Sequence, residues 1–150
     1  MDNVAKARAL AVLVPAALLG GAYLGEFGFG LYPCEMCWWQ RYPHFAALAL
    51  GLAAYALKPA QVWSALAGLA ILTSGLIGGF HAGVEYGWWE GITKCAAAPG
   101  APGAAFDFSA PIVSCGVVQW ELWGISLAGF NFLISCLAGA AIVALSAYRK

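Results

Sequence analysis

Four long runs of the sequence contain no charged residue, and this pattern restricts the possible folds more than any other feature. The runs are Ala9 to Gly25, Tyr42 to Leu57, Pro59 to Val84 and Leu122 to Tyr148. Each is close to or longer than the roughly 20 residues that cross a hydrocarbon core. Of the 150 residues, 63% are hydrophobic and 9% are charged, which is far more apolar than a soluble domain of this size. The sequence therefore predicts a membrane protein.

We expect an all-α membrane protein, a single domain over residues 1–150 built as a four-transmembrane-helix bundle with two periplasmic loops. The second run is the shortest, but the residues before it can extend it, since Arg41 near an interface can snorkel. The predicted spans are about 9–28, 39–57, 60–82 and 122–147, and the predicted loops are about 26–41 and 85–121.

The positive charges indicate the orientation, because the cytoplasmic flanks of membrane spans retain Lys and Arg. Five of the seven cations fall on the side that holds both termini: Lys6, Arg8, Lys58, Arg149 and Lys150. We therefore expect a multi-pass protein of a bacterial inner membrane with both termini in the cytoplasm. A cleavable signal peptide is the alternative for the N-terminus, but no convincing small-residue cleavage site follows the first run. The net charge of zero offers no support for a nucleic-acid partner.

Four of the five cysteines fall in the two loops expected on the outer side. Cys34 and Cys37 lie in the first loop, and Cys95 and Cys115 lie in the second. The outer face of a bacterial inner membrane is an oxidising compartment in which disulfides persist. We interpret Cys136, within the last apolar run, as a small packing residue.

The C-x-x-C spacing of Cys34 and Cys37 is typical of a disulfide that is exchanged. A span begins directly after Cys37, so the helix dipole and Arg41, one turn further on, favour a thiolate at Cys37. The alternative is half of a zinc site, completed by His44, His81 or the loop cysteines. A structural zinc site needs a closed set of four ligands, and the second cysteine pair is too widely spaced to suggest one. We expect no metal.

Cys95 and Cys115, taken alone, would be a structural staple of the second loop. Together with a C-x-x-C on the same side of the membrane, they suggest a relay in which a disulfide passes between pairs by thiolate attack. A relay needs an electron acceptor, and the bilayer holds a pool of quinones. The sequence has no G-x-G-x-x-G after a strand and no C-x-x-C-H, so neither a flavin nor a haem is indicated.

A quinone site near Cys37 would need an apolar groove and a donor to a carbonyl oxygen that becomes negative on reduction. Arg41 is the candidate donor. The candidate aromatic walls are Trp38, Tyr42 and Phe45.

Tryptophans flank the second loop at Trp88, Trp89, Trp120 and Trp123. Such rings settle at the headgroup level of a membrane, so we expect them to hold the ends of the loop there. The segment Val117 to Gly124 is predicted to form a short interfacial helix.

The segment PCEMCWWQR, Pro33 to Arg41, reads as P-C-x-x-C-x-x-x-R after a first span and resembles the DsbB family. The stretch HAGVEYGWWEGITKC, His81 to Cys95, and the run from Cys115 to Trp120 also resemble the second loop of that family. The resemblance covers nearly the whole chain. The vitamin K epoxide reductase family also has four spans and two cysteine pairs, but its C-x-x-C lies late in the chain.

The resemblance implies a thiol:quinone oxidoreductase that reoxidises a DsbA-like periplasmic thioredoxin-fold protein and reduces ubiquinone or menaquinone. It implies that Cys95 forms the mixed disulfide with this partner and that Cys115 passes electrons to Cys34. It also implies that Cys37 faces the quinone, with Arg41 beside it. The alternative function is a non-enzymatic membrane protein with structural disulfides or a zinc site.

Overall fold

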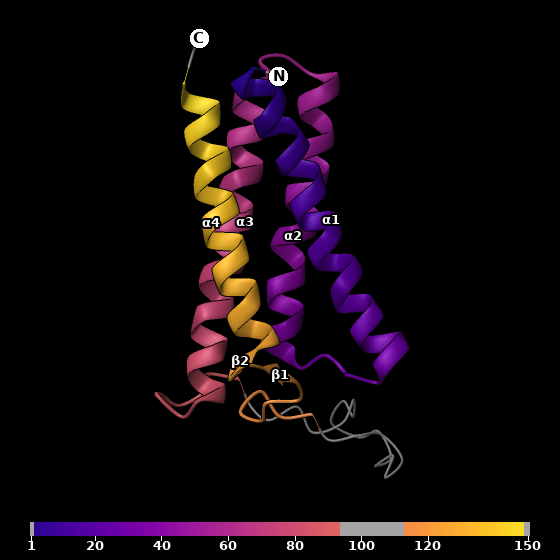
Figure 1. The fold of residues 1–150 in the computed structure, drawn as a ribbon, viewed down its shortest axis with the longest axis vertical. Helices are drawn as coiled ribbons and strands as arrows, with labels where there is room; N and C mark the ends of the chain where they lie inside the picture. Colours follow the sequence, from indigo (N-terminus) through magenta and orange to yellow (C-terminus); the bar gives the residue numbers. More distant parts are fainter. Residues whose placement is uncertain (1, 94–112, 149–150) are drawn as a thin grey trace, which may run out of the picture.

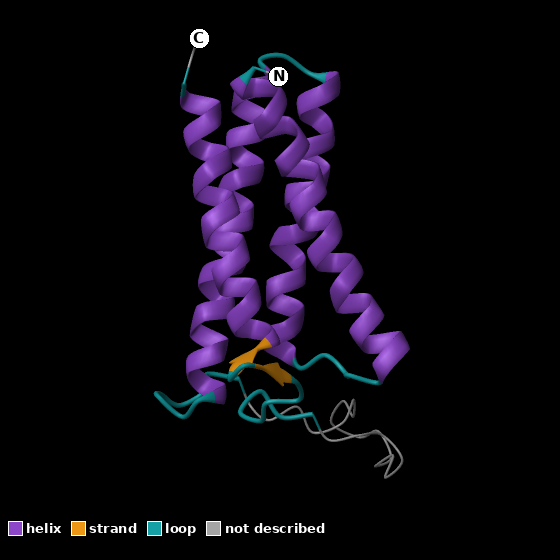
Figure 2. Cartoon of the chain, in the orientation of Figure 1, coloured by secondary structure: helices purple, strands orange, loops and turns teal. Residues whose placement is uncertain are grey.

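The computed structural model is a bundle of four long helices, described for residues 2–93 and 113–148 (Figure 1). In chain order the helices are α1 (Asn3–Phe29), α2 (Glu35–Ala56), α3 (Ala60–Glu85) and α4 (Leu127–Ala147). The two ends of the chain lie at the same end of the bundle. At the opposite end, two short strands, β1 (Glu121–Leu122) and β2 (Ile125–Ser126), pair antiparallel as a hairpin (Figure 2). The predicted all-α membrane class is confirmed.

Three of the described helices, α1, α3 and α4, are long and apolar enough to cross a membrane. Helix α2 has 22 residues, but its first half carries Gln40, Arg41 and His44. All three of these side chains are buried inside the bundle, which is where polar groups of a membrane helix find partners. That α2 forms the fourth span stays a prediction.

The last helix begins later than the sequence suggested. The predicted span started at residue 122, whereas α4 starts at Leu127, because the hairpin occupies the residues before it. Trp123 and Gly124 form the two-residue turn, with φ of 53° and 76°, a left-handed pair typical of tight hairpins. Ser126 then caps α4 by accepting a hydrogen bond from the backbone N–H of Gly129. The predicted interfacial helix over Val117 to Gly124 is therefore wrong.

Helices α3 and α4 make the most extensive contact in the bundle, and they meet through glycine. A Cβ atom on Gly139 would lie 2.7 Å from the backbone oxygen of Gly68 and 2.9 Å from the backbone nitrogen of Leu72. The backbones approach closely here, as is common where small residues line a helix contact within a membrane. The core nearby contains Ala67, Ile71 and Ile142, none of which is exposed.

We expect Gly139→Ala to destabilise the bundle by about 1–3 kcal/mol, because the new methyl group would force the two backbones apart. Gly21→Ala is the matched control, since a Cβ at Gly21 would meet nothing within 4 Å and alanine is the better helix former. Thermal unfolding of both variants in detergent measures the difference. Equal stability of the two variants would contradict the close contact.

Candidate active site

The two cysteines of the C-x-x-C motif lie at the start of α2. Cys34 is the N-cap residue, and its Sγ accepts a hydrogen bond from the backbone N–H of Cys37 at 3.3 Å. The two Sγ atoms are 2.8 Å apart and share a hydrogen bond. Cys34 is buried, and Cys37 is partly exposed. The pair is therefore a dithiol held together by the first turn of a helix.

The two thiols are not equivalent. The hydrogen bond with Cys37, followed by burial, raises the pKa of Cys34 to about 12, although the hydrogen bond with His81 opposes this shift. The raised pKa favours the protonated form of Cys34, with Cys37 as the acceptor of the shared hydrogen bond. Cys37 lies in the first turn of α2, where the helix dipole stabilises negative charge. The arrangement agrees with the expectation that Cys37 is the better thiolate.

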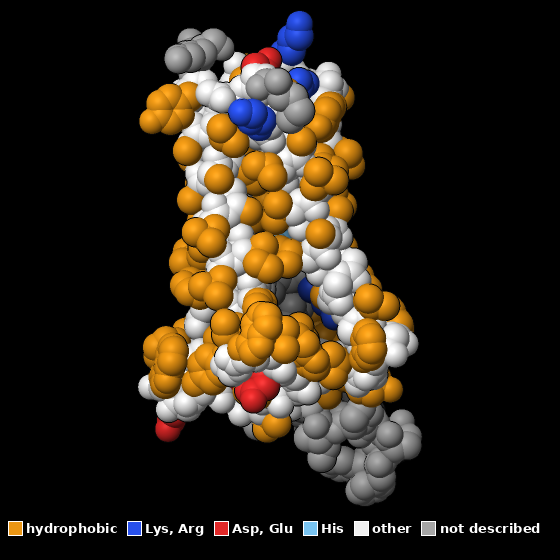
Figure 3. All heavy atoms as spheres, in the orientation of Figure 1, with side chains coloured by type: hydrophobic (Ala, Val, Ile, Leu, Met, Phe, Trp, Pro, Cys, Tyr) orange, Lys and Arg blue, Asp and Glu red, His pale blue; other side chains and the backbone are white. Residues whose placement is uncertain are grey.

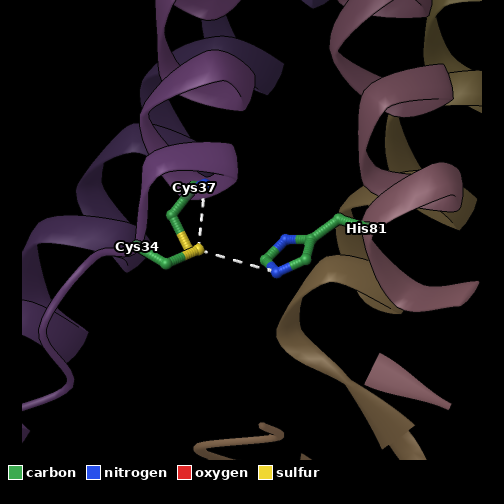
Figure 4. Close-up of side chains that lie close together, drawn as sticks. All are labelled: Cys34, Cys37 and His81. Atoms are coloured by element: carbon green, nitrogen blue, oxygen red, sulfur yellow. Dashed lines mark hydrogen bonds between the residues drawn. The ribbon is translucent and has the colours of Figure 1, made fainter. Parts of the chain in front are cut away.

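His81 of α3 faces this dithiol (Figure 4). Its Nε2 lies 3.6 Å from Cys34 Sγ, and the ligand atoms of Cys34, Cys37 and His81 all lie within 4.8 Å of one another. Glu85 Oε1 is 3.8 Å from the same Nε2. Two sulfurs and an imidazole nitrogen at this spacing could also hold a soft divalent cation such as zinc.

Cys115 joins the same buried cluster, although eighty residues separate it from Cys34 in the chain. It packs with Cys34 and Met36 and is only 6% exposed. Burial raises the pKa of the Cys115 thiol, and the hydroxyl of Thr93 donates to its Sγ at 3.4 Å. Three of the four predicted catalytic cysteines thus meet at one place. The fourth, Cys95, lies outside the described residues.

A cavity of about 670 Å³ opens beside the dithiol, between α1, α2 and α4. Figure 3 shows a hollow in this face, with hydrophobic side chains around it and a basic side chain at its edge. Most of its surface is apolar, and α1 contributes the largest group of lining residues, including Leu18, Leu24 and Phe29. Besides Cys34 and Cys37, the polar residues of its lining include Gln40, Arg41, His44, His81, Glu85 and Asn131.

Arg41 lies in the wall of this cavity and is held from several sides. Its Nη1 donates to Glu26 Oε2 of α1 at 2.6 Å, and its Nη2 donates to the Ala22 carbonyl oxygen at 3.4 Å. The guanidinium also lies over the rings of Tyr23, at 4.7 Å, and Trp38, at 4.8 Å. Arg41 is only 6% exposed, so its position is set before any ligand binds.

The predicted aromatic walls lie elsewhere. Trp38, Tyr42 and Phe45 are not among the residues that line the cavity. Trp38 packs on Arg41 and on Tyr42. On α2, Tyr42 is 59% exposed and Phe45 is 40% exposed. Proximity to Cys37 in the sequence suggested these residues. The apolar wall is instead made by α1, α4 and the loops beside them, and the sequence does not show how these segments face α2.

Sequence reasoning placed neither Gln40 nor Asn131 in the site and left the role of His81 open. Asn131 carried a readable signal, because it is the only amide side chain between Leu122 and Tyr148. A polar side chain within an apolar span is costly unless it has a partner in the protein. Gln40 and His81 gave no such signal, because both lie close to the expected membrane surface.

The fold and the site together define a helical membrane protein with a buried dithiol beside an apolar cavity. The chain matches the family described as "Disulfide bond formation protein DsbB" over residues 5–145. It is 33% identical over 152 residues to a "Disulfide bond formation protein B" of Verminephrobacter eiseniae (strain EF01-2), covering 93% of this chain and 84% of that protein. The chain belongs to the DsbB family and is a disulfide-bond-forming membrane oxidoreductase.

A second relative is an uncharacterized protein of Rickettsia prowazekii (strain Madrid E), which is 26% identical over 135 residues, with 84% of this chain and 78% of that protein covered. No solved structure matches the chain.

We expect a limiting amount of a maleimide to label Cys37 before Cys34 in the fully reduced protein at neutral pH. The thiolate is the reactive form, and the raised pKa and burial of Cys34 leave almost none of it there. Peptide mass spectrometry after brief labelling measures the order. Faster labelling of Cys34 than of Cys37 would contradict the assignment of the two thiols.

Proposed function

We propose that this protein is a membrane thiol:quinone oxidoreductase that reoxidises a DsbA-like periplasmic dithiol protein. In this proposal the disulfide passes through Cys95/Cys115 and Cys34/Cys37, and the electrons pass to a membrane quinone. The observation that carries the proposal is the packing of Cys115 against the C-x-x-C dithiol, whose two cysteines line an apolar cavity. A structural staple of the second loop would not require Cys115 to pack against Cys34.

The contacts favour one order of thiol exchange. Cys115 packs against Cys34, so its thiolate attacks Cys34 Sγ when Cys34 and Cys37 are joined as a disulfide. A Cys34–Cys115 bond forms, the Cys34–Cys37 bond breaks, and Cys37 leaves with the electron pair at the N-terminus of α2. Thr93 contacts Cys115, and Cys95 lies two residues after Thr93 in the sequence. In the proposal, Cys95 forms the mixed disulfide with the soluble partner.

The cavity fits a quinone in size and in chemistry. Its volume of about 670 Å³ is within the roughly 300–1,000 Å³ of small-molecule sites, and its wall is mostly apolar. A bound quinone would supply an acceptor for two electrons and two protons. Arg41 would hold the ring through a carbonyl oxygen, because its guanidinium is a fixed donor in the wall. Ubiquinone and menaquinone both meet this description.

The arrangement of charge supports a four-span topology with cytoplasmic termini. Lys58 lies in the turn between α2 and α3, at the end of the bundle that holds both termini (Figure 1). Lys6 and Arg8 lie near the start of α1, at the same end. The dithiol lies at the opposite end, which is periplasmic in this topology. Helix α2 then forms the fourth span across a bacterial inner membrane.

The grouping of Cys34, Cys37 and His81 favours a second candidate, a non-enzymatic membrane protein with a structural zinc ion. Cys115 beside Cys34 could complete a set of four ligands. Metal analysis of the purified protein separates the candidates. Stoichiometric zinc whose removal unfolds the bundle would favour the structural candidate over the relay.

The central experiment is quinone-dependent oxidation of a reduced thioredoxin-fold protein by the purified protein in detergent. We expect turnover with ubiquinone or menaquinone, and its loss in Cys37→Ser, Cys95→Ser and Cys115→Ser. Cys136→Ser is the matched control and should keep its activity, because Cys136 lies in α4 and packs against Gly75. Absence of turnover with either quinone, while both disulfides stay intact, would favour a structural protein.

We expect Arg41→Ala to raise the quinone KM by about tenfold or more, as the loss of a charged hydrogen-bond donor implies. Glu26→Gln should act in the same direction but less strongly, because it releases Arg41 without removing its charge. Arg8→Ala is the control, since Arg8 lies near the start of α1 over Tyr55. An unchanged KM in Arg41→Ala would show that Arg41 does not contact the quinone.

A further inference from the structure

A chain of hydrogen bonds leads from the dithiol into the interior of the bundle. It links His81 of α3 to Gln40 of α2, then Gln40 to Asn131 of α4, and Asn131 to His44 of α2. Gln40, His44 and His81 are each less than 8% exposed. Burial alone explains why the two amides have hydrogen-bond partners. It does not explain why the row of hydrogen bonds ends on a histidine beside the dithiol.

The orientation of the Gln40 amide is determined by the backbone. Its Nε2 lies 3.1 Å from the carbonyl oxygen of Met36, which can only accept, so this atom is the NH₂ group. The same NH₂ lies 2.9 Å from His81 Nδ1. Nδ1 must therefore accept, and the ring proton of neutral His81 is on Nε2.

The orientation of the Asn131 amide is determined in the same way. Its Nδ2 lies 3.2 Å from the backbone oxygen of Ser74 and donates to Gln40 Oε1 at 2.8 Å. Its Oδ1 accepts from the Ser135 hydroxyl at 2.7 Å and from His44 Nε2 at 3.0 Å. His44 Nδ1 has no hydrogen-bond partner in the described part of the chain, as expected when its proton is on Nε2. In each of the hydrogen bonds that link His44 to Asn131, Asn131 to Gln40 and Gln40 to His81, the donor is therefore the residue farther from the dithiol.

We propose that Gln40 and Asn131 are positioning residues that hold His81 in its Nε2–H tautomer, with this N–H directed at Cys34 Sγ, 3.6 Å away. The opposite tautomer would place the Nδ1–H of His81 against the NH₂ of Gln40, and Gln40 cannot turn over because the Met36 carbonyl oxygen holds it. Inside an apolar bundle, two donors that face each other without an acceptor are strongly unfavourable.

The consequence for the reaction rests on the proposed function. When a thiolate attacks Cys115 in the Cys34–Cys115 bond, the new disulfide forms on Cys115 and Cys34 leaves with the electron pair. The Nε2–H of His81 can donate to this leaving sulfur, which is otherwise buried and poorly solvated. The other groups beside the histidine are the Cys37 sulfur, the Glu85 carboxylate and the backbone carbonyl of Cys115, and all of them are acceptors for the Nε2–H.

The tautomer can be measured directly. The chain has only two histidines, so ¹⁵N-histidine NMR of the reduced protein in detergent shows two rings, which His44→Gln assigns. We expect His81 of the parent to be in the Nε2–H form. Gln40→Glu, which is similar in shape but can only accept, should move the His81 proton to Nδ1. Asn131→Leu should leave His81 as a mixture of tautomers, because the Gln40 amide loses the hydrogen bond from Asn131 that fixes its oxygen.

Gln61→Glu is the matched control, since Gln61 lies in the first turn of α3, at the other end from His81. If His81 keeps the Nε2–H form in both Gln40→Glu and Asn131→Leu, the positioning proposal is overturned. This readout needs no quinone and no thiol partner, so it stands even if the proposed relay fails.

The kinetic arm tests the consequence for the reaction. We expect Gln40→Glu to slow thiol oxidation about tenfold at saturating quinone, as loss of a hydrogen bond to a charged sulfur implies. Saturating quinone separates this rate from any change in the quinone KM, since Gln40 also lines the cavity. A shifted tautomer with an unchanged rate would overturn the assigned role of His81, while a parent without turnover would instead reject the proposed function.

Discussion

The structure depends on one constraint, which is that polar side chains in an apolar bundle must find partners within the protein. Helix α2 carries most of these side chains in its first half, and each of the other helices supplies a partner. Glu26 of α1 pairs with Arg41, and His81 of α3 and Asn131 of α4 both bond to Gln40. These three contacts, which Gln40 and Arg41 make, therefore fix the position of α2 relative to the other three helices.

The same contacts determine where the chemistry takes place. Because α2 is anchored at its first turns, Cys34 and Cys37 are held as a cap and a first-turn residue, and the two thiols become unequal. Near this end α1 is joined to α2 by an ion pair and ring contacts, and the cavity opens beside them. The cavity therefore gives an apolar ligand access to one side of the dithiol, while Cys115 reaches it from the loop.

Much of the fold could be predicted because it follows from local rules. Apolar runs of membrane length predicted where the four helices lie, but two of the predicted starts are several residues off. Helix α1 begins at Asn3 rather than at about residue 9, and α4 begins at Leu127 rather than at about residue 122, because the two-residue turn at Trp123 and Gly124 was not recognised. The C-x-x-C motif and Arg41 were predicted to form the centre of the site, and the structure places all three residues in the lining of one cavity. Trp38, Tyr42 and Phe45 were predicted to line the cavity because they follow Cys37 in the sequence. They do not line it, because proximity in the sequence does not show which helices face each other.

The sequence by itself determined that this chain is a helical membrane protein with a C-x-x-C pair before its second helix, because hydropathy and cysteine spacing act over short stretches of chain. Only the tertiary structure decided that Cys115 meets Cys34, that Glu26 holds Arg41, and that a row of buried amides ends at His81. These contacts join residues 15 to 91 positions apart, and they arise from the way in which the helices pack to satisfy their buried polar groups.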